Sequence, residues 1–361
     1  MTSRAVCCRS HPIMQLLSEF SPRKILVCQQ HQIGDVVLST PCVRILHNRF
    51  PRAVIHFLTE KKCTPVLENN PYVDKVWVID KEKGLAGMFS LYSGIRKQKF
   101  DLVVDFQQLM RLKLAVVLCG APVRLSYVPK WYNRIFYNLC GQEAVGYAAK
   151  AKAGVLSPLG VEWDGLAPEV YITSKEKEWA KRYLAERGLC DDDFLVTVDA
   201  THRRITRKWP AEYYARLIRL VSEKHPHVKF LMLYGPGEKK TVEDIVGKTE
   251  KSFRCIVSEK QTSLRQMIAL LDRADGHFGN CSAPRHFAAA VGTRSLIIHG
   301  SNKPKGWTFP SEDHGFIRNS APGACVACNR SDCRQGTLEC LYGITPEIVY
   351  ERFKEFFFRE G

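Results

Sequence analysis

The chain has 361 residues, 45% of them hydrophobic and 25% charged, and its 53 Lys and Arg outnumber its 37 Asp and Glu, giving a formal charge of +16. This length and composition predict about two domains with packed cores, and the basic charge favours phosphorylated substrates, anionic lipid surfaces or nucleic acid as partners. No apolar run approaches the roughly 20 residues of a membrane span, and we see no secretory signal at the start of the sequence. The 14 scattered cysteines are typical of reduced thiols. We therefore expect a soluble cytoplasmic protein.

The first half of the chain alternates short apolar runs with helical stretches. This alternation predicts a parallel sheet with helices on both faces. We expect strands at residues 24–29, 53–58, 75–79, 100–105 and 123–126, and helices at 36–50, 64–69, 85–97 and 110–119.

Asp35 follows the first predicted strand, at the end of the turn Gln30-His-Gln-Ile-Gly34-Asp35. Parallel α/β sheets place reactive groups at the carboxyl ends of their strands, which makes Asp35 a candidate catalytic carboxylate. Capping of the following helix is the alternative role for the same side chain.

Basic and aromatic side chains accumulate between residues 111 and 137. Arg111, Arg124 and Lys130 are interleaved there with aromatic residues such as Trp131 and Tyr132. A basic surface exposed to solvent is one interpretation of this pattern. A cleft that binds an anion is the more specific alternative.

The second half begins a new α/β series after a charged helix at 174–188, which we expect to join two domains. Two such sheets would face one another across a cleft, the commonest place for a ligand. Strands are expected at 194–198, 229–234, 255–257, 276–278 and 294–299, with a helix at 263–273.

The stretch from Phe278 to Gly292 has the features of an anion site. Small and turn-forming residues follow a predicted strand, and Pro284 then opens an Ala-rich helix. The free N–H groups and dipole of such a helix start suit a phosphate or diphosphate. An ordinary capped loop is the alternative, and His286 alone is more often structural than functional.

Two further loops carry charge at the ends of predicted strands. Thr201, Arg207 and Lys208 follow strand 194–198 and fit a second phosphate contact. Glu238 lies in the turn Gly235-Pro-Gly-Glu238, where a carboxylate suits a ribose hydroxyl or an adenine amine, or simply caps a helix.

Cys325, Cys328, Cys333 and Cys340 lie near the end of the chain. A Cys-x-x-Cys pair followed by two more cysteines is compatible with a zinc site, with packing thiols, or with a redox-labile pair. A helix rich in Phe and Tyr at 344–360 closes the chain and is expected to lie across another part of the protein.

Eight segments in order resemble the bacterial lipopolysaccharide heptosyltransferases of glycosyltransferase family 9. The resemblance covers about Lys24 to Phe353. Its segments are Ile33–Pro41, Phe50–Ile55, Asn70–Val76, Phe100–Gln107, Arg207–Pro210, Gly235–Glu238, Gly279–His286 and the Cys-rich tail ending in Ile344–Val349.

The resemblance implies an α/β GT-B fold of two Rossmann-like domains, and an enzyme that transfers a heptose from an ADP-sugar to the lipopolysaccharide inner core. It further implies that the reaction inverts the anomeric centre without a metal or other cofactor. The enzyme is expected to act at the cytoplasmic face of the inner membrane and to have no nucleic-acid partner. The corresponding domains are an N-terminal extension at 1–23, an acceptor domain at 24–175, a donor domain at 176–345 and a C-terminal helix at 346–361, which could cross back.

The resemblance also assigns roles. Asp35 matches the general base, and the anionic acceptor is expected on the basic residues of the first domain. The donor residues implied are Thr201, Arg207, Lys208, Glu238, Asn280, Cys281, Ser282, Ala283 and His286, and the acceptor residues are Arg111, Arg124 and Lys130.

Four positions depart from the family pattern. The family usually has Asp at Cys281, Gly at Ala283, Arg at Gln29 and Gly at Ser126. These departures leave open a transferase with a different donor, or a non-catalytic protein that binds a nucleotide-sugar or a glycolipid. A zinc-stabilised nucleic-acid binder is a third alternative, although the basic residues are dispersed through α/β units.

Overall fold

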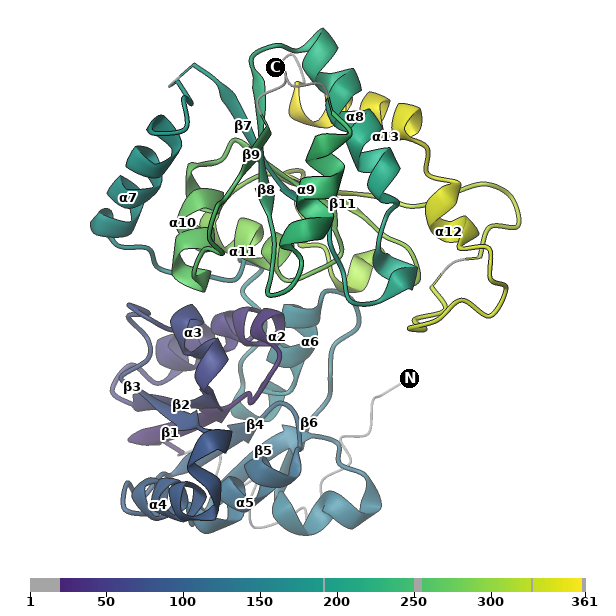
Figure 1. Ribbon diagram of the computed structural model, residues 1–361. Coiled ribbons are helices and arrows are strands. Elements are labelled where there is room, and N and C mark those ends of the chain that lie inside the picture. Colours follow the sequence, from purple (N-terminus) through teal and green to yellow (C-terminus); the bar gives the residue numbers. More distant parts are fainter. Residues whose placement is uncertain (1–19, 191, 250–254, 326, 359–361) are drawn as a thin grey trace. The chain divides into compact units, whose positions relative to one another are not determined.

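The computed structural model describes residues 20–190, 192–249, 255–325 and 327–358 (Figure 1). Residues 1–19 of the predicted N-terminal extension and residues 359–361 of the predicted C-terminal helix lie outside the described ranges. The chain forms two compact units, unit 1 at Met1–Tyr171 and unit 2 at Ile172–Gly361.

Unit 1 contains a six-stranded parallel sheet in the order β3-β2-β1-β4-β5-β6. Its strands are β1 (Lys24–Cys28), β2 (Val54–Glu60), β3 (Lys75–Ile79), β4 (Leu102–Asp105), β5 (Val123–Tyr127) and β6 (Leu139–Gly141). Its helices are α2 (Ile33–Val37), α3 (Thr40–Arg49), α4 (Gly84–Arg96), α5 (Met110–Leu118) and α6 (Ala148–Gly154), with 3-10 turns η1 (Lys61–Val66), η2 (Lys81–Lys83), η3 (Trp131–Phe136) and η4 (Ser157–Leu159). Figure 1 shows α2, α3 and α6 on one face of this sheet and α4 and α5 on the other.

Unit 2 repeats the arrangement with a parallel sheet in the order β12-β11-β10-β7-β8-β9. Its strands are β7 (Phe194–Asp199), β8 (Val228–Leu233), β9 (Cys255–Val257), β10 (Gly276–Asn280), β11 (Ser295–Ile298) and β12 (His314–Ile317). Its helices are α7 (Ser174–Ala185), α8 (Ala211–Lys224), α9 (Lys239–Gly247), α10 (Leu264–Arg273), α11 (Pro284–Val291), α12 (Glu339–Tyr342) and α13 (Pro346–Phe357), with 3-10 turns η5 (Ile205–Arg207) and η6 (Pro304–Gly306).

Helices cover both faces of each sheet, and several strands, such as β1 and β4, are therefore nearly continuous apolar runs. Ile25, Leu26, Val27 and Cys28 of β1 are all fully buried, and β1 pairs with β2 on one side and β4 on the other. A strand buried on both faces reads as a continuous apolar run instead of an alternating one, which is why these strands were predictable.

The C-terminal helix α13 belongs to the core of unit 2 and packs across α8 of the same unit. Phe353 and Phe357 are buried there, and a Cβ at Gly276 would overlap the Phe357 ring. The indole Nε1 of buried Trp209 donates to the carbonyl oxygen of Ile344 at 2.8 Å, which fixes the segment that leads into the helix.

Two predicted helices are wrong in detail. Residues 36–50 form the end of α2 and all of α3, and the two helices are separated at Leu38 and Ser39. The break arises because Pro41 has no N–H to continue the helical hydrogen bonds of α2, and it lies in the first turn of α3 instead. The helix expected at 64–69 is the 3-10 turn η1, which contains Pro65. Strands β6 and β12 and helix α6 were not predicted.

Among the described residues, every helix is too short or too polar to cross a lipid bilayer.

Candidate active site

The loops after β1, β7 and β10 lie at the switch points of the two sheets, and the Glu238 loop follows β8, the strand beside β7. In unit 2 the neighbouring strands β7 and β10 lead away from each other, to β8 and to β11. In unit 1 the corresponding neighbours are β1 and β4. Loops diverge at such points, so the carboxyl ends of these strands leave a crevice in which open α/β sheets bind ligands.

Three loops of unit 2 are joined by a hydrogen-bonded network around two carboxylates. The hydroxyl of Thr201 donates to Glu238 Oε2 at 2.7 Å, and the backbone N–H of Gly235 donates to the same oxygen at 2.8 Å. The hydroxyl of Ser282 donates to Asp199 Oδ2. The structure therefore brings the predicted residues Thr201, Glu238 and Ser282 together.

Asp199, the last residue of β7, was not identified in the sequence as a site residue. Its side chain is buried between Ser282 and Thr201. Burial, with the nearby charge of Glu238, raises its pKa from 3.8 to about 7. Only the three-dimensional burial distinguishes this aspartate from an ordinary strand-end residue.

We expect Asp199 to make the protein less stable as the pH rises from about 4 to about 7. In that window the folded state binds a proton that the unfolded state has lost, so unfolding becomes easier with increasing pH. The raised pKa corresponds to on the order of 4 kcal/mol across the window. Urea unfolding of wild type and Asp199→Asn at pH 4, 5.5 and 8 measures the difference, and parallel pH profiles for the two proteins would contradict the assignment.

Asn280 and Cys281 are turned inward. The Asn280 side chain accepts from the Trp209 N–H at 2.9 Å and donates to the Thr201 carbonyl at 3.3 Å. The thiol of Cys281 is 2% exposed and accepts from Arg285 Nη1 at 2.6 Å and from the Asn302 amide. Cys281, which stands where the family usually has an aspartate, thus accepts a hydrogen bond from the guanidinium of Arg285.

Arg285, also missed in the sequence, places a buried positive charge in the first turn of α11. Its guanidinium donates to His286 Nε2 at 3.2–3.3 Å and approaches His299 Nε2 at 3.5 Å. Burial and the charge of Arg285 hold the pKa of both imidazoles well below the ordinary value, so they are neutral. Within the described ranges no carboxylate pairs with Arg285, and its charge remains available to an anion near the helix start. His286 itself is committed to Arg285.

Backbone donors lack helical partners at the start of α11, where the sequence predicts an anion site. Ala283 and Pro284 lie at its first turn and are half-buried. The N–H groups of Ala283 and Arg285 have no partner within the helix, because first-turn donors have none. A Cβ at Gly279 would overlap the carbonyl oxygen of Asp199, so glycine is required where β10 passes β7.

Arg207 and Lys208 differ in their freedom. Arg207 Nη2 donates to Asn329 Oδ1 at 2.6 Å, and its Nε is buried without a partner. Lys208 is half-buried, and its ammonium group has no hydrogen-bond or ion-pair partner in the part of the chain that the structure describes. Lys208 is thus the freer cation of the pair.

In unit 1 Asp35 lies in α2, in the loop region after β1. Its carboxylate accepts from the Gln32 N–H at 3.5 Å, the outer limit of a hydrogen bond, and it is partly exposed. The preceding turn is fixed by Gln107, whose Oε1 accepts from the N–H groups of Gln30 and His31 at 2.9 and 3.1 Å. The capping contact is weak, so the carboxylate is free for other chemistry.

Lys152 was also missed, because nothing in α6 marks it. Its ammonium donates to Gln29 Oε1 at 2.7 Å. Burial lowers the pKa of Lys152, and attraction to Asp35 opposes that shift. A cation therefore interacts with the position where the family usually has an arginine.

The three predicted acceptor residues do not lie together. Arg111 opens α5 after β4, and Lys130 precedes η3 after β5, so both follow strand carboxyl ends and both are exposed. Arg124 lies in the amino half of β5, and its Nε donates to the Phe136 carbonyl at 2.9 Å. The Nε group of Arg124 therefore makes a structural contact, and the side chain is half-buried.

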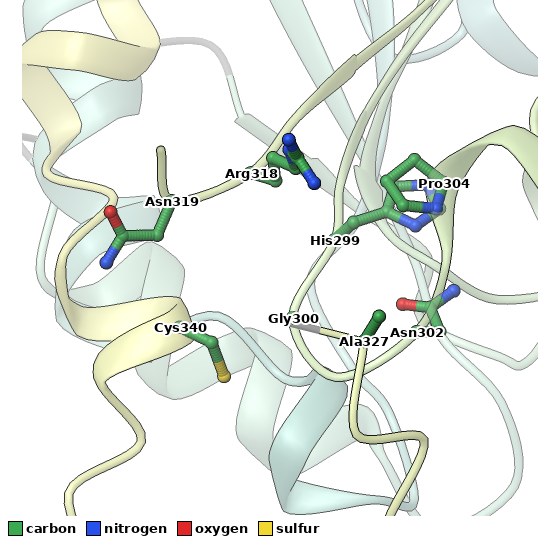
Figure 2. A pocket seen from close by; sticks show the side chains of 8 residues that line it. All are labelled: His299, Gly300, Asn302, Pro304, Arg318, Asn319, Ala327 and Cys340. Carbon is green, nitrogen blue, oxygen red and sulfur yellow. The ribbon is translucent and has the colours of Figure 1, made fainter. Parts of the chain in front are cut away.

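A small cavity lies beyond the end of β11 (Figure 2). Figure 2 shows His299, Asn302 and Ala327 on one side of it and Cys340 on the other. His299 Nδ1 and Asn302 Oδ1 are buried without partners among the described residues, which suits a bound water. Among the described residues no three His, Cys, Asp or Glu side chains are arranged to hold a metal ion, and this set includes the four late cysteines.

Two doubly wound parallel sheets, each with polar loops at its switch point, place this protein in the GT-B fold class. The family model for glycosyltransferase family 9 (heptosyltransferase) matches residues 88–338. The chain belongs to this family, which confirms the resemblance found in the sequence.

Relatives of known name match between three quarters and nearly all of the chain. Lipopolysaccharide heptosyltransferase 3 of Escherichia coli is 25% identical over 76% of this chain and 82% of its own length. Lipopolysaccharide heptosyltransferase 2 of Escherichia coli K12 is 22% identical over 93% of this chain and 99% of its own.

Solved structures confirm the predicted fold. A family 9 glycosyltransferase from Veillonella parvula superposes with a TM-score of 0.81 at 22% identity, covering 95% of this chain and 99% of the other. The Escherichia coli ADP-heptose heptosyltransferase II gives a TM-score of 0.74 at 19% identity, covering 93% and 98%.

Proposed function

We propose that this enzyme transfers a heptose from an ADP-activated donor to the inner core of lipopolysaccharide, at the cytoplasmic face of the inner membrane, with inversion and without a metal or cofactor. The observation that carries the proposal is the placement of Asp35 and of the loops around Ser282 at the switch points of two family 9 sheets. The names of its relatives support heptose and lipopolysaccharide as the substrate classes, and one neighbour of the same fold was solved with ADP-2-deoxy-2-fluoro heptose.

Asp35 acts as the general base. An acceptor hydroxyl becomes a good nucleophile only as its proton is removed, and a positioned carboxylate removes it in the transition state. The oxygen then attacks the anomeric carbon from the face opposite ADP, which inverts that centre in a single displacement. The loose contact between Asp35 and the Gln32 N–H leaves the carboxylate lone pairs for this proton.

The groups of unit 2 stabilise the departing ADP. Negative charge grows on the diphosphate as the glycosidic bond breaks, and positive groups held in place before the reaction lower its barrier. The free ammonium of Lys208, the start of α11 and the buried charge of Arg285 supply those groups. Glu238 keeps Oε1 for a donor on the nucleoside, since Thr201 and Gly235 bond only to Oε2.

The acceptor is an anionic glycolipid held by exposed cations of unit 1. Arg111 and Lys130 follow the carboxyl ends of β4 and β5, on the same edge as the Asp35 loop. Both suit phosphate or carboxylate groups of an inner-core sugar.

The test is transfer itself. Purified protein is incubated with ADP-heptose and an inner-core acceptor that lacks heptose, and the product is measured by mass spectrometry together with released ADP. We expect one heptose added per acceptor and no comparable transfer from UDP-glucose. Tight ADP-heptose binding without transfer or hydrolysis would contradict the proposal and support a non-catalytic binder.

A further inference from the structure

One surface of unit 1 combines exposed apolar side chains with cations. It is formed by α4, α5 and η3, which contact one another in sequence; Figure 1 shows α4 and α5 side by side under the sheet. We call it the basic-apolar face and define it by six apolar residues. These are Leu85, Phe89, Met110, Leu114, Trp131 and Ile135, which are 90%, 77%, 61%, 41%, 79% and 78% exposed.

The exposed apolar residues follow helical spacing away from the core. Leu85 and Phe89 are four residues apart on α4, and Met110 and Leu114 are four apart on α5. Residues spaced by four share one side of a helix, while Tyr92 and Leu112 of the same helices are buried. The two helices thus have apolar residues both toward the sheet and toward the outside, a pattern that marks an interaction surface.

The same segment is strongly basic. From Lys83 to Gly141 the sequence contains nine Lys and Arg, two Asp and no Glu. Lys113 is buried and donates to Asn133. Apart from the proposed acceptor residues, the exposed cations are Lys83, Arg96, Lys97, Lys99 and Arg134. Asp105 is buried against Tyr137, so Asp101 is the one acidic side chain of this segment that offsets surface charge, and it accepts from the N–H groups of residues 23 and 24.

We propose that the basic-apolar face docks on an anionic lipid bilayer. Apolar and aromatic side chains insert at the level of the headgroups while flanking Lys and Arg pair with lipid phosphates. A second copy of the chain is a poor occupant, because two faces with this excess of cations repel each other. This inference rests on the proposed function for the purpose of the docking, which is to bring the enzyme to an acceptor embedded in the membrane.

Vesicle co-sedimentation of the full chain tests the docking without any substrate. We expect binding to vesicles of phosphatidylethanolamine and phosphatidylglycerol, weak binding to phosphatidylcholine, and release as salt rises from 0.1 to 0.5 M. The double variant Trp131→Ala, Ile135→Ala should lose about 10-fold in partitioning. The matched control Tyr342→Ala, Ile348→Ala removes side chains of unit 2 that are 45% and 50% exposed, and should bind like wild type.

Three results would overturn the docking: no binding of wild type to anionic vesicles, equal loss in both double variants, or a dimer in ultracentrifugation that the Trp131→Ala, Ile135→Ala variant dissolves. Activity separates this inference from the proposed function. The variant should act normally on a water-soluble, delipidated acceptor and poorly on the same acceptor in vesicles. If wild type transfers to neither acceptor, the proposed function fails while the vesicle result still decides the docking.

Discussion

Replacing Asp35 by Asn should reduce heptose transfer by about 10²- to 10⁴-fold, the contribution typical of a positioned general base. The amide has nearly the shape of the carboxylate but cannot take up the acceptor proton. Affinity for ADP should be unchanged, because Asp35 lies in unit 1 and the predicted donor residues lie in unit 2. Initial rates with saturating acceptor, and ADP affinity by calorimetry, measure both quantities.

Glu82→Gln provides the control for this change. Glu82 is a carboxylate of unit 1 whose side chain is 85% exposed, and we expect its loss to leave transfer unchanged. Equal product from wild type and Asp35→Asn would remove Asp35 as the base. A loss accompanied by altered circular dichroism would instead reflect damage to α2, and Asp35→Glu would then be measured for partial recovery.

Lys208→Met should lower kcat/KM for the donor by about 10²- to 10³-fold, comparable to losing one preorganised group that stabilises developing charge. The loss should appear for ADP-heptose and for ADP inhibition but not for adenosine inhibition, because the ammonium acts on the diphosphate. Arg207→Met should cost less, since that guanidinium already donates to Asn329.

Lys240→Met serves as the matched control, because Lys240 is an exposed lysine of α9. It should leave donor kinetics unchanged. A greater loss from Arg207→Met than from Lys208→Met would reverse the roles of the two cations. Equal weakening of ADP and adenosine inhibition by Lys208→Met would mean that the lysine supports the loop and does not contact the diphosphate.

The sequence by itself determined the parallel α/β class and where the reactive residues follow strands. Strands such as β1 are buried on both faces, so an unbroken apolar run marks them locally, and the residues after such a run must lie at a carboxyl edge. Asp35, Thr201, Glu238 and Ser282 could all be found in this way. Hydrophobic periodicity does not reveal the family of the enzyme. The eight segments that resemble family 9, in the same order, did reveal it.

The tertiary structure decided which side chains are free and which are committed. Arg124 and His286 have the residue types of ligand contacts, yet Nε of Arg124 donates to the Phe136 carbonyl and Nε2 of His286 accepts from the Arg285 guanidinium. The raised pKa of Asp199 and the approach of Lys152 to Gln29 were equally invisible, since they join residues up to 123 positions apart. Burial and hydrogen bonding depend on the packing of distant segments, whereas strand and helix signals are local, and that difference separates the two sets of findings.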